Sequence, residues 1–471
     1  MIISLDCETT GLDFAHGAMP FLVTWCEEGC DKPYFVEWDV DPLTRVPQVD
    51  PADVAYIVEL LDAADTIYMQ GPKFDCRALA TVGVSLPWHK VRDTITASHI
   101  LESNGRHDLT ALCVTYLGVD IEPYELAVEE VTRACRKIAK RDNPTWKLAD
   151  EGVPGMPSVK ASSKRDEDKP WKNDMWLPRA IVKWYDQHKK VYPDVDEFIG
   201  YRTACSTYAN ADSYYDLHLG LELERLLRQR ALWSIYEHRL HLPRIAAEME
   251  SYGVTVIGEW TESTICEYQQ HIAEADAELT SIAATYGHDL QLASGAALND
   301  NMRDFFYGSV TVKCTRCSYT KRMKHWNGEG EAPWLDTPNC PKCFKGSKKY
   351  PGSIQKLVTT RHENLSLPIV CNEKTGNASL DSNAMREYLT TLEGTPHDFI
   401  RILTDKRKHD TALTYMQSYR RFWVPTVHAG FHRIHPSLNP CGTDHLRWSS
   451  NSPNLQNVGK QEQRCEECDG E

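Results

Sequence analysis

The chain has 471 residues, of which 41% are hydrophobic and 25% are charged, and its formal net charge is −15. The length predicts several domains with buried cores, and the composition excludes a disordered or fibrous protein. The acidic balance argues against a general polyanion-binding surface but leaves room for a local basic groove. No stretch reaches the apolar length that spans a bilayer, so no membrane partner is expected.

The 16 cysteines and the N-terminal sequence indicate the cellular compartment in which the protein is expected. The first apolar run is interrupted at Asp6 and has no basic flank, so it is not a signal peptide. A long chain with many scattered cysteines and no export signal predicts reduced core thiols. We expect a cytoplasmic protein, and the compact N-terminus and unusual insertions favour a virus or phage, in which case the location is the host cytoplasm.

The first ten residues predict a short strand that carries two carboxylates, Asp6 and Glu8. Side chains two residues apart on a strand share a face, so these two acids can share a metal ion. Burying two like charges is unfavourable unless a cation neutralises them, and oxygen ligands suit Mg²⁺ or Mn²⁺. The alternative is an edge strand with two solvated acids, and partners farther along the chain decide between the two.

The following segments alternate between strand and helix patterns. The expected strands cover residues 21–26, 34–38 and 66–70, and the first two continue an antiparallel meander from the N-terminal strand. The expected helices cover residues 51–64, 76–82, 93–101 and 108–117, the last with Asp108 as its N-cap. Asp75 follows the third of these strands, and a carboxylate at that end of a strand faces the crevice that α/β sheets use for ligands.

The segment from about 140 to 175 is rich in Pro, Gly, Ser and charged residues, and we expect an inserted, mobile loop there. Helical spacing returns at about Leu177, and residues 203–227 form one long helical pattern. Within it, Tyr208 and Asp212 are four residues apart and therefore project from one helical face.

Asp6 with Glu8, then Asp75, then Tyr208-x3-Asp212 resemble the three exonuclease motifs of the DEDD nucleases. The resemblance is to the tyrosine subclass, because Thr207 stands where the histidine subclass has His. It implies a ribonuclease-H-like α/β domain over residues 1–222, in which four carboxylates hold two Mg²⁺ or Mn²⁺ ions and Tyr208 orients water. It also implies single-strand contacts by Lys73 and Phe74, although Gly71 replaces an Asn that helps to hold DNA in the family.

After a helical stretch over 231–250, residues 237–250 resemble the entry to the polymerase region of family A DNA polymerases, and residues 261–286 fit a long thumb helix. The resemblance resumes at 367–381 and 399–415, where it implies DNA contacts by Arg407 and Lys408. Residues 433–457 resemble the primer–template contact motif. The implied contacts there are Arg447, Ser449, Asn454 and Gln456, and His445-Leu446 departs from the usual Thr-Gly.

A zinc ribbon is expected as an insertion over about 312–347. Its four ligands would be Cys314, Cys317, Cys340 and Cys343, in the pattern C-x2-C-x22-C-x2-C of a closed structural Zn²⁺ site. The alternative is two unrelated reduced pairs. Nine basic and three acidic residues lie between positions 313 and 349, which predicts phosphate contacts. A solvated ribbon that only keeps the insertion folded is the other interpretation.

These matches predict an α/β exonuclease domain followed, over 223–471, by a mostly helical polymerase thumb and an incomplete palm. The expected activity is 3′→5′ removal of nucleotides from a primer terminus, which is proofreading, with primer–template DNA and a single-stranded 3′ end as partners. The palm carboxylates of the family do not follow Asn457, so we expect the N-terminal portion of a longer or split polymerase. A second polypeptide with palm and fingers would then supply polymerisation. A free-standing exonuclease with a vestigial thumb and a non-catalytic DNA-binding subunit stay open as alternatives.

Overall fold

The structure is a computed structural model. It describes residues 1–149, 170–188, 203–292, 296–307, 309–314, 320–324, 357–361, 364–368, 370, 379–443, 445 and 447–457. By packing, the chain divides into two compact units, Met1–Gly258 with Ser418–Glu471, and Glu259–Gln417. The predicted boundary between the exonuclease domain and the polymerase part, near residue 222, falls inside a continuous helix, Ala204–Gln229. This boundary stays a prediction. Within the described ranges, no helix is long and apolar enough to cross a bilayer.

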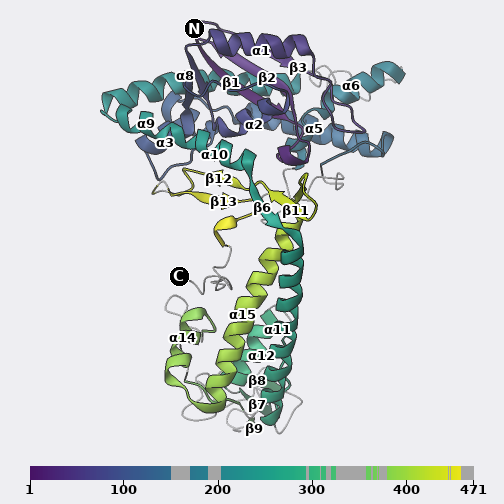
Figure 1. Ribbon diagram of the computed structural model, residues 1–471, viewed down its shortest axis with the longest axis vertical. Helices are drawn as coiled ribbons and strands as arrows, with labels where there is room; N and C mark the ends of the chain where they lie inside the picture. The colour runs from purple at the N-terminus through teal and green to yellow at the C-terminus, as the bar shows by residue number, and fades with distance from the viewer. Residues whose placement is uncertain are drawn as a thin grey trace, which may run out of the picture. The chain divides into compact units, whose positions relative to one another are not determined.

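The first unit is built around a five-stranded mixed sheet in the order β3-β2-β1-β4-β5. Strands β1, β2 and β3 of this sheet are labelled in Figure 1. The strands are β1 Ile2–Thr9, β2 Pro20–Glu27, β3 Tyr34–Glu37, β4 Thr66–Met69 and β5 Val91–Asp93. Strands β1, β2 and β3 pair in antiparallel fashion, which confirms the predicted meander, while β1 and β4 are parallel.

The two faces of β1 have different neighbours because side chains alternate along a strand. Ile3, Leu5 and Cys7 are buried in one core with apolar residues of helices α1 (Pro51–Ala63) and α2 (Lys73–Thr81). The residues between them face helix α8 (Ala204–Gln229), as the packing of Ile2 beside the Leu217 cluster shows. Asp6 and Glu8 belong to this second set, so the alternation presents both carboxylates to α8.

The other helices of the first unit are α3 Thr94–Leu101, α4 Leu109–Leu112, α5 Glu122–Asp142, α6 Leu177–His188, α9 Trp233–Arg239 and α10 His241–Tyr252. They include α5, a 21-residue helix that was not predicted from the sequence. Short turns are Phe14–His16, Pro170–Asp174, Arg420–Phe422 and Leu455–Asn457, and a π-helical turn covers Cys113–Leu117.

Three of the predicted helices differ from those observed. Asp108 is the N-cap as predicted, but the expected single helix is the short α4 followed by the π-helical turn. The single helix expected over 231–250 is two helices, and Pro243, which lacks an N–H, lies in the first turn of the second. Helix α2 begins at Lys73, three residues earlier than predicted, so that Asp75 lies in its first turn.

The inserted loop expected over 140–175 stays a prediction, and both of its described ends pack against the rest of the first unit. Helix α5 continues to Asp142, and Trp146, Leu148 and Trp171 are buried in the core formed with α6 and α8. The buried Asp174 accepts a hydrogen bond of 2.7 Å from Arg45 and pairs with Arg136. The prediction rested on the average composition of the segment, which does not show that a few large apolar residues and one ion-paired acid are buried. Residues 150–169 lie outside the described part.

Two small sheets complete the first unit. One has the order β10-β11-β6, formed by Val424–Pro425, Phe431–Ile434 and Val254–Ile257. The other pairs β12 (Ser437–Asn439) with β13 (Ser449–Asn451) in antiparallel fashion. This second sheet contains the segment that resembles the primer–template motif.

The second unit consists mainly of helices around an aromatic core that contains Phe305, Tyr388 and Phe399. The helices are α11 Gly258–Thr285, α12 Ala296–Tyr307, α14 Ser382–Thr391 and α15 Gly394–Tyr419. The long α11 confirms the helix predicted over 261–286. The strands β7 Ser309–Cys314, β8 Thr320–Lys324 and β9 Leu357–Arg361 form an antiparallel sheet.

The predicted zinc ribbon is only partly within the described residues. Cys314 is the last residue of β7, whereas Cys317, Cys340 and Cys343 lie outside the described ranges. The zinc site therefore stays a prediction.

Candidate metal-dependent active site

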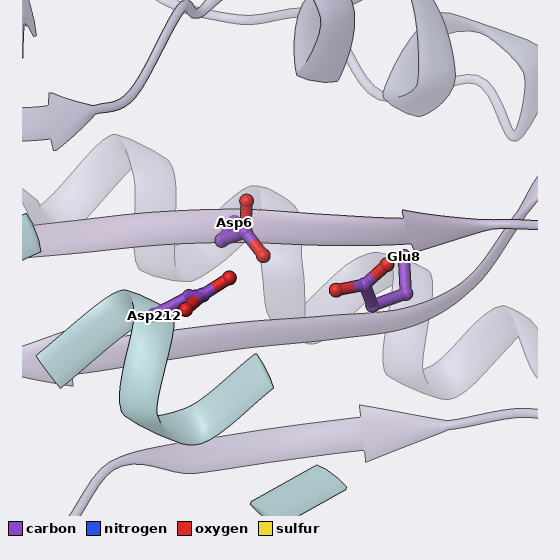
Figure 2. Close-up of side chains that lie close together, drawn as sticks. All are labelled: Asp6, Glu8 and Asp212. Atoms are coloured by element: carbon purple, nitrogen blue, oxygen red, sulfur yellow. The ribbon is translucent and has the colours of Figure 1, made fainter. Parts of the chain in front are cut away.

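Three carboxylates converge between the sheet and helix α8. Asp6, Glu8 and Asp212 each offer an oxygen, and these oxygens lie within 4.8 Å of one another. Figure 2 shows Asp6 and Glu8 on the same strand and Asp212 on the neighbouring helix, with its carboxylate directed toward Asp6. All three side chains are partly buried. Oxygen ligands at this spacing fit a hard divalent cation such as Mg²⁺ or Mn²⁺.

Small polar residues bring α8 close to the sheet at this point. Ser4 on β1 donates a hydrogen bond to the backbone carbonyl of Ser213, and Thr24 on β2 donates one of 3.2 Å to the carbonyl of Ala209. Farther along α8, a Cβ on Gly220 would lie 2.3 Å from the ring of Tyr68, so only glycine permits this approach. These contacts place Asp212, next to Ser213, opposite β1.

Asp75 belongs to the same site but is held separately. Its side chain is 2% exposed, and its Oδ1 accepts a hydrogen bond of 3.1 Å from the backbone N–H of Cys7, between the two acids of β1. It is not one of the three mutually close ligands. The turn into α2 passes through Gly71 at φ +76°, a conformation that favours glycine, and a Cβ there would lie 3.1 Å from Ile95.

Burial and mutual repulsion make all four acids hard to ionise without a cation. Burial raises the pKa of Asp6 to about 6. The pKa values of Glu8, Asp75 and Asp212 are raised well above their usual range, first by burial and next by the negative charge of Asp6. A bound divalent cation favours the ionised forms, so the arrangement suits metal binding better than metal-free solvation.

Tyr208 lies one helical turn before Asp212 on α8. A hydrogen bond between the two side chains offsets part of the rise in the pKa of Asp212. Burial and the neighbouring acids raise the pKa of Tyr208 itself well above its usual value, so the phenol stays neutral. A neutral hydroxyl beside a metal-binding carboxylate can orient a water molecule.

Sequence reasoning missed a cation near this cluster. Lys172 lies in the turn Pro170–Asp174, and its Nζ is 2.8 Å from the carboxylate of Glu125. Its positive charge offsets part of the rise in the pKa of both Glu8 and Asp212, so its ammonium group lies within electrostatic reach of the site. Nothing in the local sequence marks Lys172, because it falls in the polar segment that was predicted to be an inserted loop.

Two of the predicted DNA contacts lie beside Asp75 on α2. The ammonium group of Lys73 is 2.5 Å from Oε1 of Glu250, and the ring of Phe74 packs 5.2 Å from that of Phe14. Lys73 is therefore held within the protein. Two more predicted contacts lie in the second unit, where Arg407 donates to the carbonyl of Leu380 at 2.7 Å and Lys408 pairs with Asp405.

The remaining predicted DNA contacts lie at β13 and the turn after it. Arg447 is exposed, and Ser449 pairs with Asn439 across the β12–β13 ladder. The amide of Gln456 donates to the carbonyl of Trp448 at 3.1 Å, and Asn454 Oδ1 accepts from the backbone N–H of Gln456 at 3.0 Å. These bonds order the segment, and its DNA contacts stay predictions.

Comparison with known proteins bears on the fold. No model of a known protein family matches the chain, and no curated protein matches it by sequence. Among solved structures, it is similar to the POL domain of Pol1 from M. smegmatis in complex with DNA primer-template and dNTP, with a TM-score of 0.56 and 16% identity. The chain has a polymerase-like fold. The match covers 98% of this chain and 53% of the other, so the chain spans about half the length of that neighbour.

Proposed function

We propose that this chain is the 3′→5′ exonuclease part of a family A DNA polymerase and removes nucleotides from the 3′ end of DNA. The observation that carries the proposal is the convergence of the Asp6, Glu8 and Asp212 carboxylates within 4.8 Å, in a chain with a polymerase-like fold. Its first compact unit would combine the ribonuclease-H-like exonuclease domain with the start of the palm.

The residues of the site have different roles in phosphodiester hydrolysis. Asp6, Glu8, Asp212 and the adjoining Asp75 would hold two Mg²⁺ or Mn²⁺ ions, which supply an activated water and stabilise the leaving oxygen. The hydroxyl of Tyr208 orients the water toward phosphorus. The water oxygen becomes bonded to phosphorus, the bond to the 3′ oxygen breaks, and the product is a 5′-mononucleotide.

The segment around β13 is proposed to hold the primer–template duplex. Arg447 is exposed there, and Ser449, Asn454 and Gln456 offer hydroxyl and amide groups for the backbone and minor groove. The structural neighbour was solved with a DNA primer-template, which supports DNA as the partner. We also propose one structural Zn²⁺ on Cys314, Cys317, Cys340 and Cys343. Nucleotide addition is assigned to a segment or second polypeptide that carries the rest of the palm and the fingers.

Digestion of a 5′-labelled single-stranded oligonucleotide tests the proposed activity. With Mg²⁺, wild-type protein is expected to give a ladder that shortens from the 3′ end, and to release 5′-mononucleotides. Asp6→Ala with Glu8→Ala is expected to abolish the ladder. Equal digestion in EDTA, or by the double variant, would overturn the proposed function.

A further inference from the structure

Glu250 is a buried acid that the nuclease chemistry does not use. It lies near the end of α10 and is 1% exposed. Its Oε1 is 2.5 Å from Nζ of Lys73, and its Oε2 is 2.7 Å from Nη1 of Arg77. The backbone N–H of Leu438 donates a third hydrogen bond to Oε1. Two cations and one amide therefore satisfy this carboxylate inside the protein.

The two cations flank Asp75 on helix α2. Lys73 precedes Asp75 by two residues and Arg77 follows it by two, and a helix turns by about 100° per residue. Lys73 and Arg77 therefore lie on one face and Asp75 lies on the opposite one. Glu250 holds the first face, while the backbone N–H of Cys7 holds Asp75 on the other. The rotation of α2 about its axis is fixed from both sides.

The ion pair of Glu250 with Lys73 also contacts strand β12. The Glu250 carboxylate accepts a hydrogen bond from the Leu438 N–H. Lys73 donates to the Leu438 carbonyl at 2.8 Å and to the Ser437 hydroxyl at 3.4 Å. The backbone carbonyl of Glu250 lies 2.7 Å from Nδ1 of His435, just before this strand. Helix α2, helix α10 and the sheet that contains the primer–template segment thus meet at one side chain.

We propose that Glu250 is a positioning residue for the exonuclease site, which fixes the helix that carries Asp75 against strand β12. This inference rests on the proposed function. Loss of the Glu250 charge leaves Lys73 and Arg77 without their buried partner and frees α2 to rotate. Asp75 then moves away from the Cys7 N–H and from the other three acids. Metal affinity falls although every metal ligand is still present.

Glu250→Gln tests the proposal, because glutamine keeps the shape of the side chain and removes its charge. The matched control is Glu248→Gln, on the same helix, where an exposed acid forms an ion pair with Arg244. Mn²⁺ affinity is measured by calorimetric titration, and exonuclease rate is measured against Mg²⁺ concentration. Circular dichroism verifies that both variants are folded.

Glu250→Gln is expected to weaken Mn²⁺ binding by about 10-fold or more, as for residues that orient metal ligands. The Mg²⁺ concentration for half-maximal rate rises in parallel, and saturating Mg²⁺ restores most of the rate, which a general loss of structure would not do. Glu248→Gln is expected to match wild type. If Glu250→Gln does not fold, Arg77→Met, which keeps the Lys73–Glu250 pair, is expected to shift both quantities in the same direction.

The outcomes separate this inference from the proposed function. Wild-type digestion with an unchanged Mn²⁺ affinity in a folded Glu250→Gln protein overturns the positioning role alone. If wild-type protein binds Mn²⁺ but digests no DNA, the proposed function fails and the Mn²⁺ titrations still decide the role of Glu250. If wild-type protein binds no Mn²⁺, both fail.

Discussion

The carboxylate of Asp6 lies beside that of Asp212, although one belongs to the first strand and the other to a helix late in the first unit. Hydrogen bonds from Ser4 and Thr24 to α8 hold the two elements together near this point. The contact therefore brings like charges together at a cost in folding free energy. A divalent cation bound by these acids would offset this cost.

The first prediction concerns Asp6→Asn in metal-free protein. The pKa of Asp6 is raised to about 6 in the folded state, so this acid ionises more easily in the unfolded chain and its ionisation disfavours folding. The loss of stability begins near the unfolded pKa and is complete above the folded one. In EDTA at pH 8, urea unfolding is expected to show the variant more stable by about 1–3 kcal/mol. The difference should vanish near pH 3.5. A less stable variant at pH 8 would contradict the electrostatic account.

The second prediction concerns the response to metal. Mn²⁺ is expected to raise the melting temperature of wild-type protein, because a ligand at one hundred times its Kd stabilises by about 2.7 kcal/mol. Asp6→Asn with Asp212→Asn should remove most of that rise. Asp405→Asn, a half-exposed acid in the second unit, serves as the control and should keep it. An equal rise in all three proteins would place the metal elsewhere.

The third prediction concerns pH. Asp6 must be ionised to hold a cation, and its metal-free pKa is about 6. At subsaturating Mg²⁺, the exonuclease rate is expected to rise as pH increases through 6 and to continue rising above it, because the pKa values of Glu8, Asp75 and Asp212 are also raised. At saturating Mg²⁺ the rise should move to lower pH, because the cation favours the ionised carboxylates. A profile that does not move with Mg²⁺ concentration would argue against metal binding by these acids.

The fourth prediction concerns the buried ion cluster of Asp174. This acid is fully buried and is paired with both Arg45 and Arg136. Asp174→Ala leaves two arginines without that partner and should destabilise the protein by about 3–5 kcal/mol. The exposed Arg244–Glu248 pair offers the comparison, and Arg244→Ala should cost about 0–1 kcal/mol. Similar urea midpoints for the two variants would show that the buried cluster contributes little.

The parts of the site that follow from local periodicity could be predicted from the sequence. Alternation along β1 placed Asp6 and Glu8 on one face, and helical spacing placed Tyr208 one turn from Asp212. Contacts between distant segments could not be predicted in this way. Glu250 with Lys73 depends on the packing of α10 and β12 against α2, which no local pattern encodes.

The segment that contains Lys172 shows a second limit of sequence reasoning. Its mean composition is that of a loop, and composition alone gives no weight to a single tryptophan. Trp171 is 1% exposed in the core, and Asp174 is paired with Arg45, which lies far away in the sequence. Long-range packing of a few residues therefore ordered the described ends of the segment and brought Lys172 near the acids.

The central claim is that Asp6, Glu8, Asp75 and Asp212 form one two-metal site. The most direct test is anomalous diffraction from crystals grown with Mn²⁺. We expect anomalous peaks for two ions beside these four carboxylates, about 3.5–4 Å apart, and their loss in Asp6→Asn with Asp212→Asn. Crystals of wild-type protein at saturating Mn²⁺ with no anomalous peak beside Asp6, Glu8 and Asp212 would contradict it.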